Sequence, residues 1–321
     1  MTTDAHRSRP LRFGLVAATP RGPQWRDFAV DVEAAGLDVL SLPDHLVPTM
    51  APFAGCAVAA AATTRLHTGT LVLNNDLRHP VDTARETATL AALSGGRFEL
   101  GLGAGHMKSE YDATGLTFDS GATRVARLIE SVDIVRALLD GDAVQVDGQH
   151  YRVHADAGAL VAAPPHHVPL LIGGNGTEVL RLAGRRADIV GLAGFGHNRD
   201  ATRVRLTHFD FDGVQDRIGV VREAAGDRFD QLELNALVQA VVHTDNRDAA
   251  AEELAAGFGA DITAEELLTS PFVLIGSHAE MAQAIVDRHR SLGISYWTVF
   301  DTWADRPSAL PDLAEVIKLL H

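Results

Sequence analysis

The feature that most constrains the fold is a strand–helix–strand pattern in residues 65–106. An apolar and β-branched run at residues 67–73 predicts a strand. Pro80 predicts the start of a helix, because proline at the first helical position loses no hydrogen bond. Ser94-Gly95-Gly96 predicts its end, and residues 97–102 predict a second strand. Two apolar strands joined through a helix form a parallel βαβ unit.

The same alternation of apolar strands and helical patterns continues along the chain. Eight apolar runs predict strands, at residues 11–18, 37–42, 67–73, 97–102, 169–172, 188–192, 232–243 and 296–300. This order favours an α/β fold, a (β/α)8 TIM barrel with insertions near residues 106–120, 141–168 and 196–212. A doubly wound parallel sheet is the alternative. We expect residues 1–10 to be a flexible tail and residues 11–321 to form a single barrel domain.

Three segments outside the regular repeat also carry structural expectations. Residues 143–153 alternate around Asp147-Gly148, which predicts a β-hairpin. Residues 196–210 are polar and predict a loop. The unbroken apolar run at residues 232–243 predicts one long strand.

The composition narrows the class of protein and its partners. A net charge of −14 argues against nucleic acid or an anionic membrane surface as a partner. No apolar run approaches the ~18 residues of a membrane-spanning helix, and residues 1–10 lack the apolar core of a secretory signal. Cys56 is the only cysteine, which excludes an intrachain disulfide framework. We therefore expect a cytoplasmic protein that acts on a small molecule.

The strongest local signal for ligand binding is the segment Ile172-Gly173-Gly174-Asn175-Gly176, which lies between a predicted strand and a predicted helix. The first N–H groups of a helix lack partners within the helix, and the helix dipole places positive charge there. Backbone amides and dipole together bind phosphate groups. The alternative is a tight turn in which glycine serves the backbone geometry alone.

Polar residues also follow two other predicted strands. In Asp44-His45, the histidine can hold or donate a proton near neutral pH, and a carboxylate beside it can fix its tautomer. The alternative is a helix-capping aspartate next to an exposed histidine. Asn74-Asn75-Asp76 is polar where a buried strand should end, so these groups need a bulge, a ligand or an Asx turn to satisfy them.

Two other classes of site are weaker interpretations. The glycines at 101, 103 and 105 lack the G-x-G-x-x-G spacing of a dinucleotide site. With the residues that follow them, from His106 to Tyr111, they favour a functional loop, and the alternative is a strand end whose glycines let another backbone approach closely. The sequence has no His-Glu-x-x-His motif, and His166-His167 follows two prolines in a predicted surface loop. We therefore expect no metal, and a metal-dependent barrel hydrolase is the weaker alternative.

These motifs together resemble the luciferase-like monooxygenase superfamily and, within it, the actinobacterial oxidoreductases that use the deazaflavin coenzyme F420. The resemblance rests on residues 68–105, Pro43-Asp44-His45-Leu46, Glu110-Tyr111, residues 169–192 and residues 270–300. It implies a (β/α)8 barrel with the cofactor ring in its mouth, and often a homodimer. It specifies neither the substrate nor the choice between F420 and FMN.

The resemblance also implies roles for individual residues. His45 would be the acid–base group in hydride transfer, oriented by Asp44. A bulge with a non-prolyl cis peptide near Thr70-Leu71-Val72 would back the cofactor ring, and the glycine turn after residue 172 would hold its phosphate. The implied cofactor-binding residues are Thr70, Leu71, Val72, Asn74, Gly103, Ala104, Gly105, His106, Ile172, Gly173, Gly174, Asn175 and Gly176.

One departure from the family concerns His106, where many relatives have tryptophan. Histidine offers less stacking area and adds a titratable group. Lys108, Arg78 and His106 are candidate contacts for the anionic tail of F420.

Three functional hypotheses follow from the sequence. The first is an F420-dependent oxidoreductase that transfers a hydride between F420 and a small organic substrate. The second is a monooxygenase that uses reduced FMN and oxygen. The third is a non-catalytic protein that carries flavin or F420.

Overall fold

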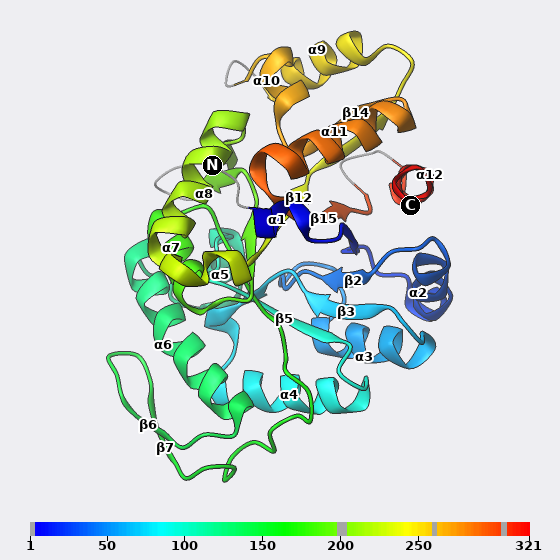
Figure 1. The fold of residues 1–321 in the computed structure, drawn as a ribbon. Helices are drawn as coiled ribbons and strands as arrows, with labels where there is room; N and C mark the ends of the chain where they lie inside the picture. The colour runs from blue at the N-terminus through cyan, green and yellow to red at the C-terminus, as the bar shows by residue number, and fades with distance from the viewer. Residues whose placement is uncertain (1–3, 198–203, 259–261, 303–306) are drawn as a thin grey trace.

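The computed structural model describes residues 4–197, 204–258, 262–302 and 307–321. Eight parallel strand positions, called staves below because one of them consists of two short strands, close into a barrel (Figure 1). The staves are β1 (Arg12–Val16), β2 (Val39–Leu42), β3 (His67–Thr70) with β4 (Leu73–Asn74), β5 (Phe98–Gly103), β8 (Leu170–Gly173), β9 (Ile189–Leu192), β12 (Glu233–Val238) and β15 (Ile294–Phe300). The third stave pairs with β2 on one side and with β5 on the other, and β1 pairs with β15, so the sheet has no free edge. This closure confirms the predicted (β/α)8 barrel and excludes the doubly wound sheet.

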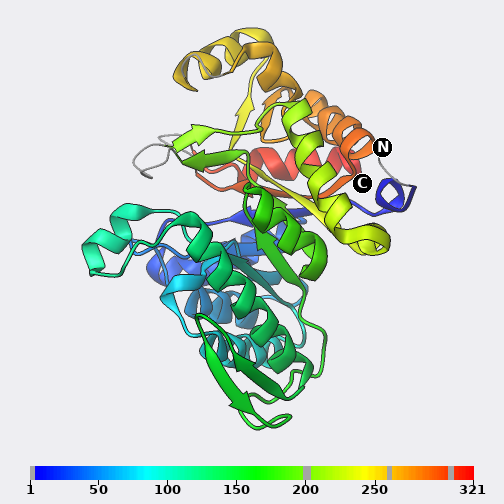
Figure 2. The same cartoon turned by 90° about the vertical axis from the view of Figure 1, so that its left-hand side faces the viewer.

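Helices surround the strands, as the two views in Figures 1 and 2 show. They are α2 (Trp25–Ala34), α3 (Pro52–Ala62), α4 (Pro80–Leu93), α6 (Gly121–Asp140), α7 (Thr177–Arg186), α8 (Phe211–Ala225), α11 (His278–Leu292) and α12 (Leu310–Leu320). Helix α4 begins at Pro80 as predicted, and Gly95 and Gly96 follow it with positive φ. Its buried face carries Ala84 and Ala88, whose small side chains let the helix pack closely on the barrel.

Shorter elements decorate this frame. They are α1 (Asp4–Ser8), α5 (Lys108–Thr114), β6 (Val144–Asp147), β7 (Arg152–Ala155), β10 (Phe195–His197), β11 (Val204–Leu206), β13 (Ala240–His243), β14 (Val273–Gly276), α9 (Arg247–Phe258), α10 (Ala264–Thr269) and the 3₁₀ turns Gly22–Gln24, Asn75–Leu77 and Gly226–Gln231. Strands β6 and β7 form the hairpin predicted around Asp147-Gly148 and project from the barrel (Figure 2).

Two strand predictions were wrong. The long strand expected at residues 232–243 is two strands, because β12 pairs within the barrel whereas β13 leaves it and pairs with β14. The polar segment at residues 196–210 is not simply a loop, since β10 pairs with β11 in an antiparallel hairpin. Its residues 198–203 lie outside the part of the chain that the structure describes.

Residues 1–10, which we expected to be a flexible tail, contact the barrel where the structure describes them. His6 in α1 is 1% exposed and packs on Phe229, with ring centroids 4.5 Å apart. Arg9 Nη2 donates to the carbonyl of Gln231 at 3.1 Å, and the carbonyl of Arg7 lies 3.1 Å from Nε2 of His289. This polar segment thus packs on the barrel through hydrogen bonds to backbone carbonyls and through the buried His6 ring. The hydropathy of the sequence does not reveal such contacts.

The third stave contains the predicted irregularity. Between the pairs Gly69–Glu99 and Leu73–Leu102, it has one residue more than β5, which is a β-bulge. Within the bulge, the Leu71–Val72 peptide bond is cis, as the family resemblance implies. Leu71 and Val72 line the cavity at the barrel mouth.

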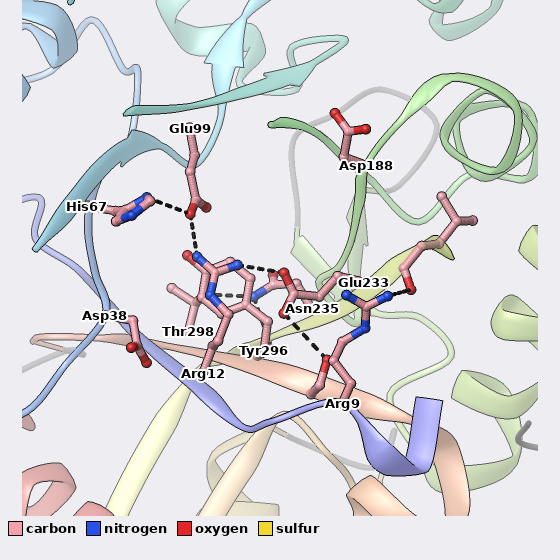
Figure 3. A network of polar contacts seen from close by, with 12 residues as sticks. Arg9, Arg12, Asp38, His67, Glu99, Asp188, Glu233, Asn235, Tyr296 and Thr298 are labelled. Carbon is pink, nitrogen blue, oxygen red and sulfur yellow. Dashed lines mark hydrogen bonds and ion pairs between the residues drawn. The ribbon is translucent and has the colours of Figure 1, made fainter. Parts of the chain in front are cut away.

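A network of charged side chains fills the opposite end of the barrel, the floor (Figure 3). Arg12, the first residue of β1, binds Glu99 of β5 and Glu233 of β12, with an Nη1–Oε2 distance of 2.6 Å to Glu233. Its guanidinium lies 4.5 Å from the centre of the Tyr296 ring, and His67 Nδ1 lies 3.4 Å from Glu99. Both carboxylates are buried, with residue exposures of 4% and 6%.

The two carboxylates of the floor respond differently to this setting. Burial alone would raise the pKa of Glu99, but His67 and Arg12 outweigh it and hold the pKa below its usual value. Burial raises the pKa of Glu233, and Arg12 compensates only in part. Arg12 is therefore the cation that permits both acids to lie inside the barrel.

We expect Arg12→Ala to lower the free energy of unfolding by about 3–5 kcal/mol, because it leaves two buried carboxylates without their cation. Urea unfolding followed by circular dichroism measures this loss. Arg152→Ala is the matched control, since its ion pair with Asp147 is 81% and 65% exposed; it should change stability by at most about 1 kcal/mol. Equal stability of Arg12→Ala and wild type would contradict the role given to the floor network.

Candidate active site

A cavity of about 1080 Å³ opens at the carboxyl ends of the barrel strands, where α/β barrels hold their sites. All eight staves or the segments that follow them contribute to its wall. The predicted residues that line it are Asp44, His45, Leu71, Val72, Asn74, Gly103, Ala104, Gly105, His106, Gly173, Gly174, Asn175 and Gly176. Segments distant in the sequence thus meet in one site.

Two predicted contact residues lie behind the cavity wall. The Thr70 hydroxyl donates to the carbonyl of Gly101 and accepts from its N–H, both at 2.9 Å, so it joins two staves. Ile172 is fully buried in the core. Residues of a strand point alternately to its two faces. A prediction that takes a whole segment as a contact surface therefore includes side chains that face away from the ligand.

His45 lies at the end of β2 and has a carboxylate partner, but that partner is not Asp44. Its Nδ1 is 2.9 Å from Oε1 of Glu110 in α5, and the same oxygen accepts the N–H of Leu46 at 3.1 Å. Glu110 is only 4% exposed. The carboxylate fixes the proton on Nδ1, which leaves Nε2 as the ring nitrogen that can exchange a proton with a ligand.

Asp44 has a different role from the predicted one. Its carboxylate forms a bidentate ion pair with Arg78, at 2.5 and 3.1 Å, and accepts the N–H of Asn74 at 3.0 Å. It therefore ties the end of β2 to the end of the third stave. Arg78 is engaged in this pair and does not line the cavity, so the contact expected between Arg78 and an anionic cofactor tail has no support from the geometry.

The other two candidates for an anionic tail do line the cavity. The Lys108 ammonium is 2.6 Å from Asp112 in the next turn of α5. The ring of His106 meets that of His45 edge to face, with centroids 5.4 Å apart. His106 is thus part of the surroundings of the acid–base candidate.

Glycines shape the wall behind the bulge. A Cβ at Gly103 would lie 2.6 Å from the Val72 side chain, and one at Gly101 would lie 2.0 Å from the carbonyl oxygen of Thr70. Gly105 has φ +77°, and a Cβ there would lie 2.4 Å from Oδ1 of Asn74. Another backbone thus approaches closely only at Gly101, whereas side chains fill the space beside Gly103 and Gly105.

The turn between β8 and α7 forms a backbone cradle at the other side of the cavity. Gly176 is the N-cap of α7 and supplies no side chain to the first N–H groups of the helix. A Cβ at Gly176 would meet nothing within 4 Å, so the space over this helix end is open. Asn175 turns aside, with its amide 2.5 Å from the carbonyl of Thr207. The residues present therefore fit a phosphate group.

The cavity also exposes contacts that the sequence motifs did not indicate. Asn235 of β12 is fully buried and donates to Thr298 Oγ1 at 2.7 Å, yet its Oδ1 has no partner among the described residues. Phe195, Phe258 and Phe300 supply apolar surface. Glu110 belongs to a motif of the family resemblance, but nothing in that motif indicated its pairing with His45. Asn235 lies within an apolar run and had no local sequence signal.

The fold and the cavity define a class of (β/α)8 barrels whose binding site opens at the carboxyl ends of the strands. The sequence model of the luciferase-like monooxygenase family matches residues 11–295. The chain therefore belongs to the luciferase-like monooxygenase family.

Similar curated proteins include two F420-dependent glucose-6-phosphate dehydrogenases. The enzyme of Nakamurella multipartita is 32% identical over 252 residues, which cover 75% of this chain and 70% of that protein. The enzyme of Microbacterium testaceum is 38% identical over 189 residues, which cover 56% of this chain and 55% of that protein. The match to the second relative therefore spans little more than half of each protein.

Solved structures with the same fold include proteins of different activities. An F420-dependent secondary alcohol dehydrogenase, in complex with an F420–acetone adduct, superposes with a TM-score of 0.77 at 20% identity and covers 98% of this chain and 100% of that one. A long-chain alkane monooxygenase gives a TM-score of 0.74 at 15% identity and covers 98% and 91%. At these identities the likeness establishes the fold alone.

We expect Asp44→Ala to lower the free energy of unfolding by about 3 kcal/mol, because the partly buried Arg78 loses its carboxylate. The double variant Asp44→Ala/Arg78→Ala should cost less than the sum of the two single variants, since a charge is no longer left alone. Urea unfolding of the four proteins gives the coupling energy. Additive losses would show that the pair does not tie the two strand ends together.

Proposed function

We propose that the protein is an F420-dependent oxidoreductase that transfers a hydride between coenzyme F420 and a small organic substrate. The observation that carries the proposal is that one cavity contains both the His45–Glu110 pair and the open N-terminus of α7. An acid–base group and a phosphate cradle on opposite walls suit a phosphate-bearing cofactor with a reacting ring between them. The F420-dependent relatives support the choice of cofactor.

The residues of the cavity have separable roles in this proposal. The backbone N–H groups from Asn175 to the start of α7 would hold the cofactor phosphate, because the N–H of Gly174 donates to the carbonyl of Gly191. Leu71 and Val72 would back the ring, and Oδ1 of Asn235 is a free acceptor for an N–H group at the cavity wall. F420, when bound, supplies a carbon that accepts or donates the hydride. Most of the rate acceleration would come from positioning in this enclosed space.

His45 would handle the proton that accompanies hydride transfer. Oxidation of an alcohol by hydride loss also releases a proton, and Nε2 of His45 can accept it while Glu110 stabilises the resulting imidazolium. In the reverse direction the same nitrogen donates the proton. Glu110 acts through His45, so we assign it a positioning role.

Other features of the protein stay predictions. The cytoplasmic location and the homodimer follow from the sequence and the family resemblance. Within the described residues, no helix is long and apolar enough to cross a membrane. The cavity supports a small-molecule substrate, since its volume of about 1080 Å³ is at the upper end of the roughly 300–1,000 Å³ typical of small-molecule and cofactor sites.

Separate titrations of F420 and FMN against the purified protein test the choice of cofactor. We expect saturable binding of F420, measured by the change in its fluorescence, and much weaker binding of FMN. Tight FMN binding without F420 binding would overturn the assignment and favour a reduced-flavin monooxygenase. Oxygen consumption in the presence of a flavin reductase would then identify that reaction.

We expect His45→Ala to lower kcat by about 10²- to 10⁴-fold, the usual contribution of general acid–base catalysis. Affinity for F420 should change little, because the phosphate cradle lies on another segment. His154→Ala is the control, since His154 lies on the β6–β7 hairpin and contacts Gln145 and Asp147 rather than the cavity. Unchanged turnover in His45→Ala would contradict the catalytic role, and F420 binding without any turnover by wild type would favour a carrier.

A further inference from the structure

Three side chains that can ligate a metal converge outside the cavity. His243 ends β13, His278 begins α11, and Asp312 lies in the first turn of α12. One ligand atom from each lies within 4.8 Å of the other two. None of the three lines the cavity, so this cluster is separate from the candidate active site.

The contacts within the cluster centre on a single carboxylate oxygen. Oδ1 of Asp312 lies 2.9 Å from Nε2 of His278 and 3.6 Å from Nδ1 of His243. The two imidazole rings stack, with centroids 4.0 Å apart and planes 15° apart. Two nitrogens therefore approach one oxygen from the same side.

These separations suit a divalent transition metal. Zinc binds histidine nitrogen and carboxylate oxygen at about 2.0–2.2 Å, so two ligand atoms of a tetrahedral site lie about 3.4 Å apart. The two measured distances, 2.9 and 3.6 Å, lie on either side of that value. The donor set of two imidazoles and one carboxylate favours Zn²⁺, Co²⁺ or Ni²⁺ over Mg²⁺ or Ca²⁺, which prefer oxygen ligands.

The backbone holds the three ligands from separate elements. Strands β13 and β14 pair in parallel with His243 opposite Gly276, two residues before His278. The N–H of Thr244 donates to the carbonyl of Gly276 at 3.1 Å, which fixes this register beyond the end of the strand. In Figure 1, β14 and α11 lie next to one another, with α12 beside them. The ligand positions are thus set by sheet pairing and helix packing.

We propose that His243, His278 and Asp312 form a peripheral site for one divalent transition-metal ion. Three protein ligands leave a fourth tetrahedral position for water, and the 46% exposure of the His243 side chain gives an ion access from solvent. The ion would take the place of the proton that His278 and Asp312 now share. Because parallel rings cannot both point an in-plane lone pair at one ion, the exposed His243 ring turns on binding.

Such an ion would clamp the C-terminal helix to the barrel's periphery. It would link β13, α11 and α12 through bonds that the unfolded chain cannot make together, and so stabilise the fold in proportion to its occupancy. The clamp requires no participation in hydride transfer. The metal site can therefore be tested independently of the proposed F420-dependent activity.

Cobalt and zinc titrations of the full-length protein test the site. Protein without a histidine tag, freed of metal with a chelator, is titrated with Co²⁺ by visible absorption and with Zn²⁺ by calorimetry. We expect one ion per chain and a higher Tm in the presence of Zn²⁺. His278→Ala and His243→Ala should each weaken binding by at least about tenfold, since even loss of an outer-shell partner costs 10–100-fold.

His154→Ala provides the matched control. His154 Nε2 lies 3.1 Å from Asp147 in an exposed histidine–aspartate pair that has no third histidine, cysteine or acidic ligand among the residues that the structure describes, so this variant should bind the ion as wild type does. The exposed position of His243 makes His243→Ala safe for folding if His278→Ala folds poorly. Absence of saturable binding by wild type, or wild-type affinity in His243→Ala, would overturn the proposal. F420 titrations of the same variants should give unchanged affinity.

Discussion

The guanidinium of Arg12 is the interaction on which the rest of the barrel depends. A small closed barrel must fill its interior with side chains, and here the floor contains two carboxylates and a tyrosine beside aliphatic groups such as Val39 and Ile189. One planar cation satisfies Glu99 and Glu233 at once, which joins strands from the first, fourth and seventh staves. Because these ion pairs join the strands at the floor, the carboxyl ends of the strands can remain open and form the cavity.

The layer above the floor connects it to the cavity. Thr298 and the Tyr296 carbonyl, both on β15, accept the amide of Asn235, a residue of the cavity wall whose Oδ1 has no partner in the part of the chain that the structure describes. A buried acceptor without a partner is costly unless a ligand or water satisfies it. The polar side chains inside the barrel thus end at Oδ1 of Asn235, an acceptor that a bound ligand would satisfy.

Much of the fold was predictable because apolar runs, proline and glycine act locally. The eight staves and the start of α4 at Pro80 agree with these local signals. The bulge in the third stave was expected from the family resemblance alone. Partner choice was not predictable, because it depends on tertiary contacts. His45 and Glu110 are separated by 65 positions, and the adjacent Asp44 turns away to Arg78. Likewise, one apolar run supplies both β12 and β13, since hydropathy does not specify which strand each will pair with.

The break between β12 and β13 gives the protein a stiff connector. One residue, Gln239, separates Val238 in the barrel from Ala240 in the outer sheet, and its amide is bound to the carbonyls of Ala193 and Leu237. From Leu237 in the cavity wall to His243 at the surface, an extended chain runs about 20 Å, at roughly 3.3 Å per residue. The cavity wall at Leu237 and the surface residue His243 therefore lie on one extended segment. A shift of this segment along its own direction displaces both residues.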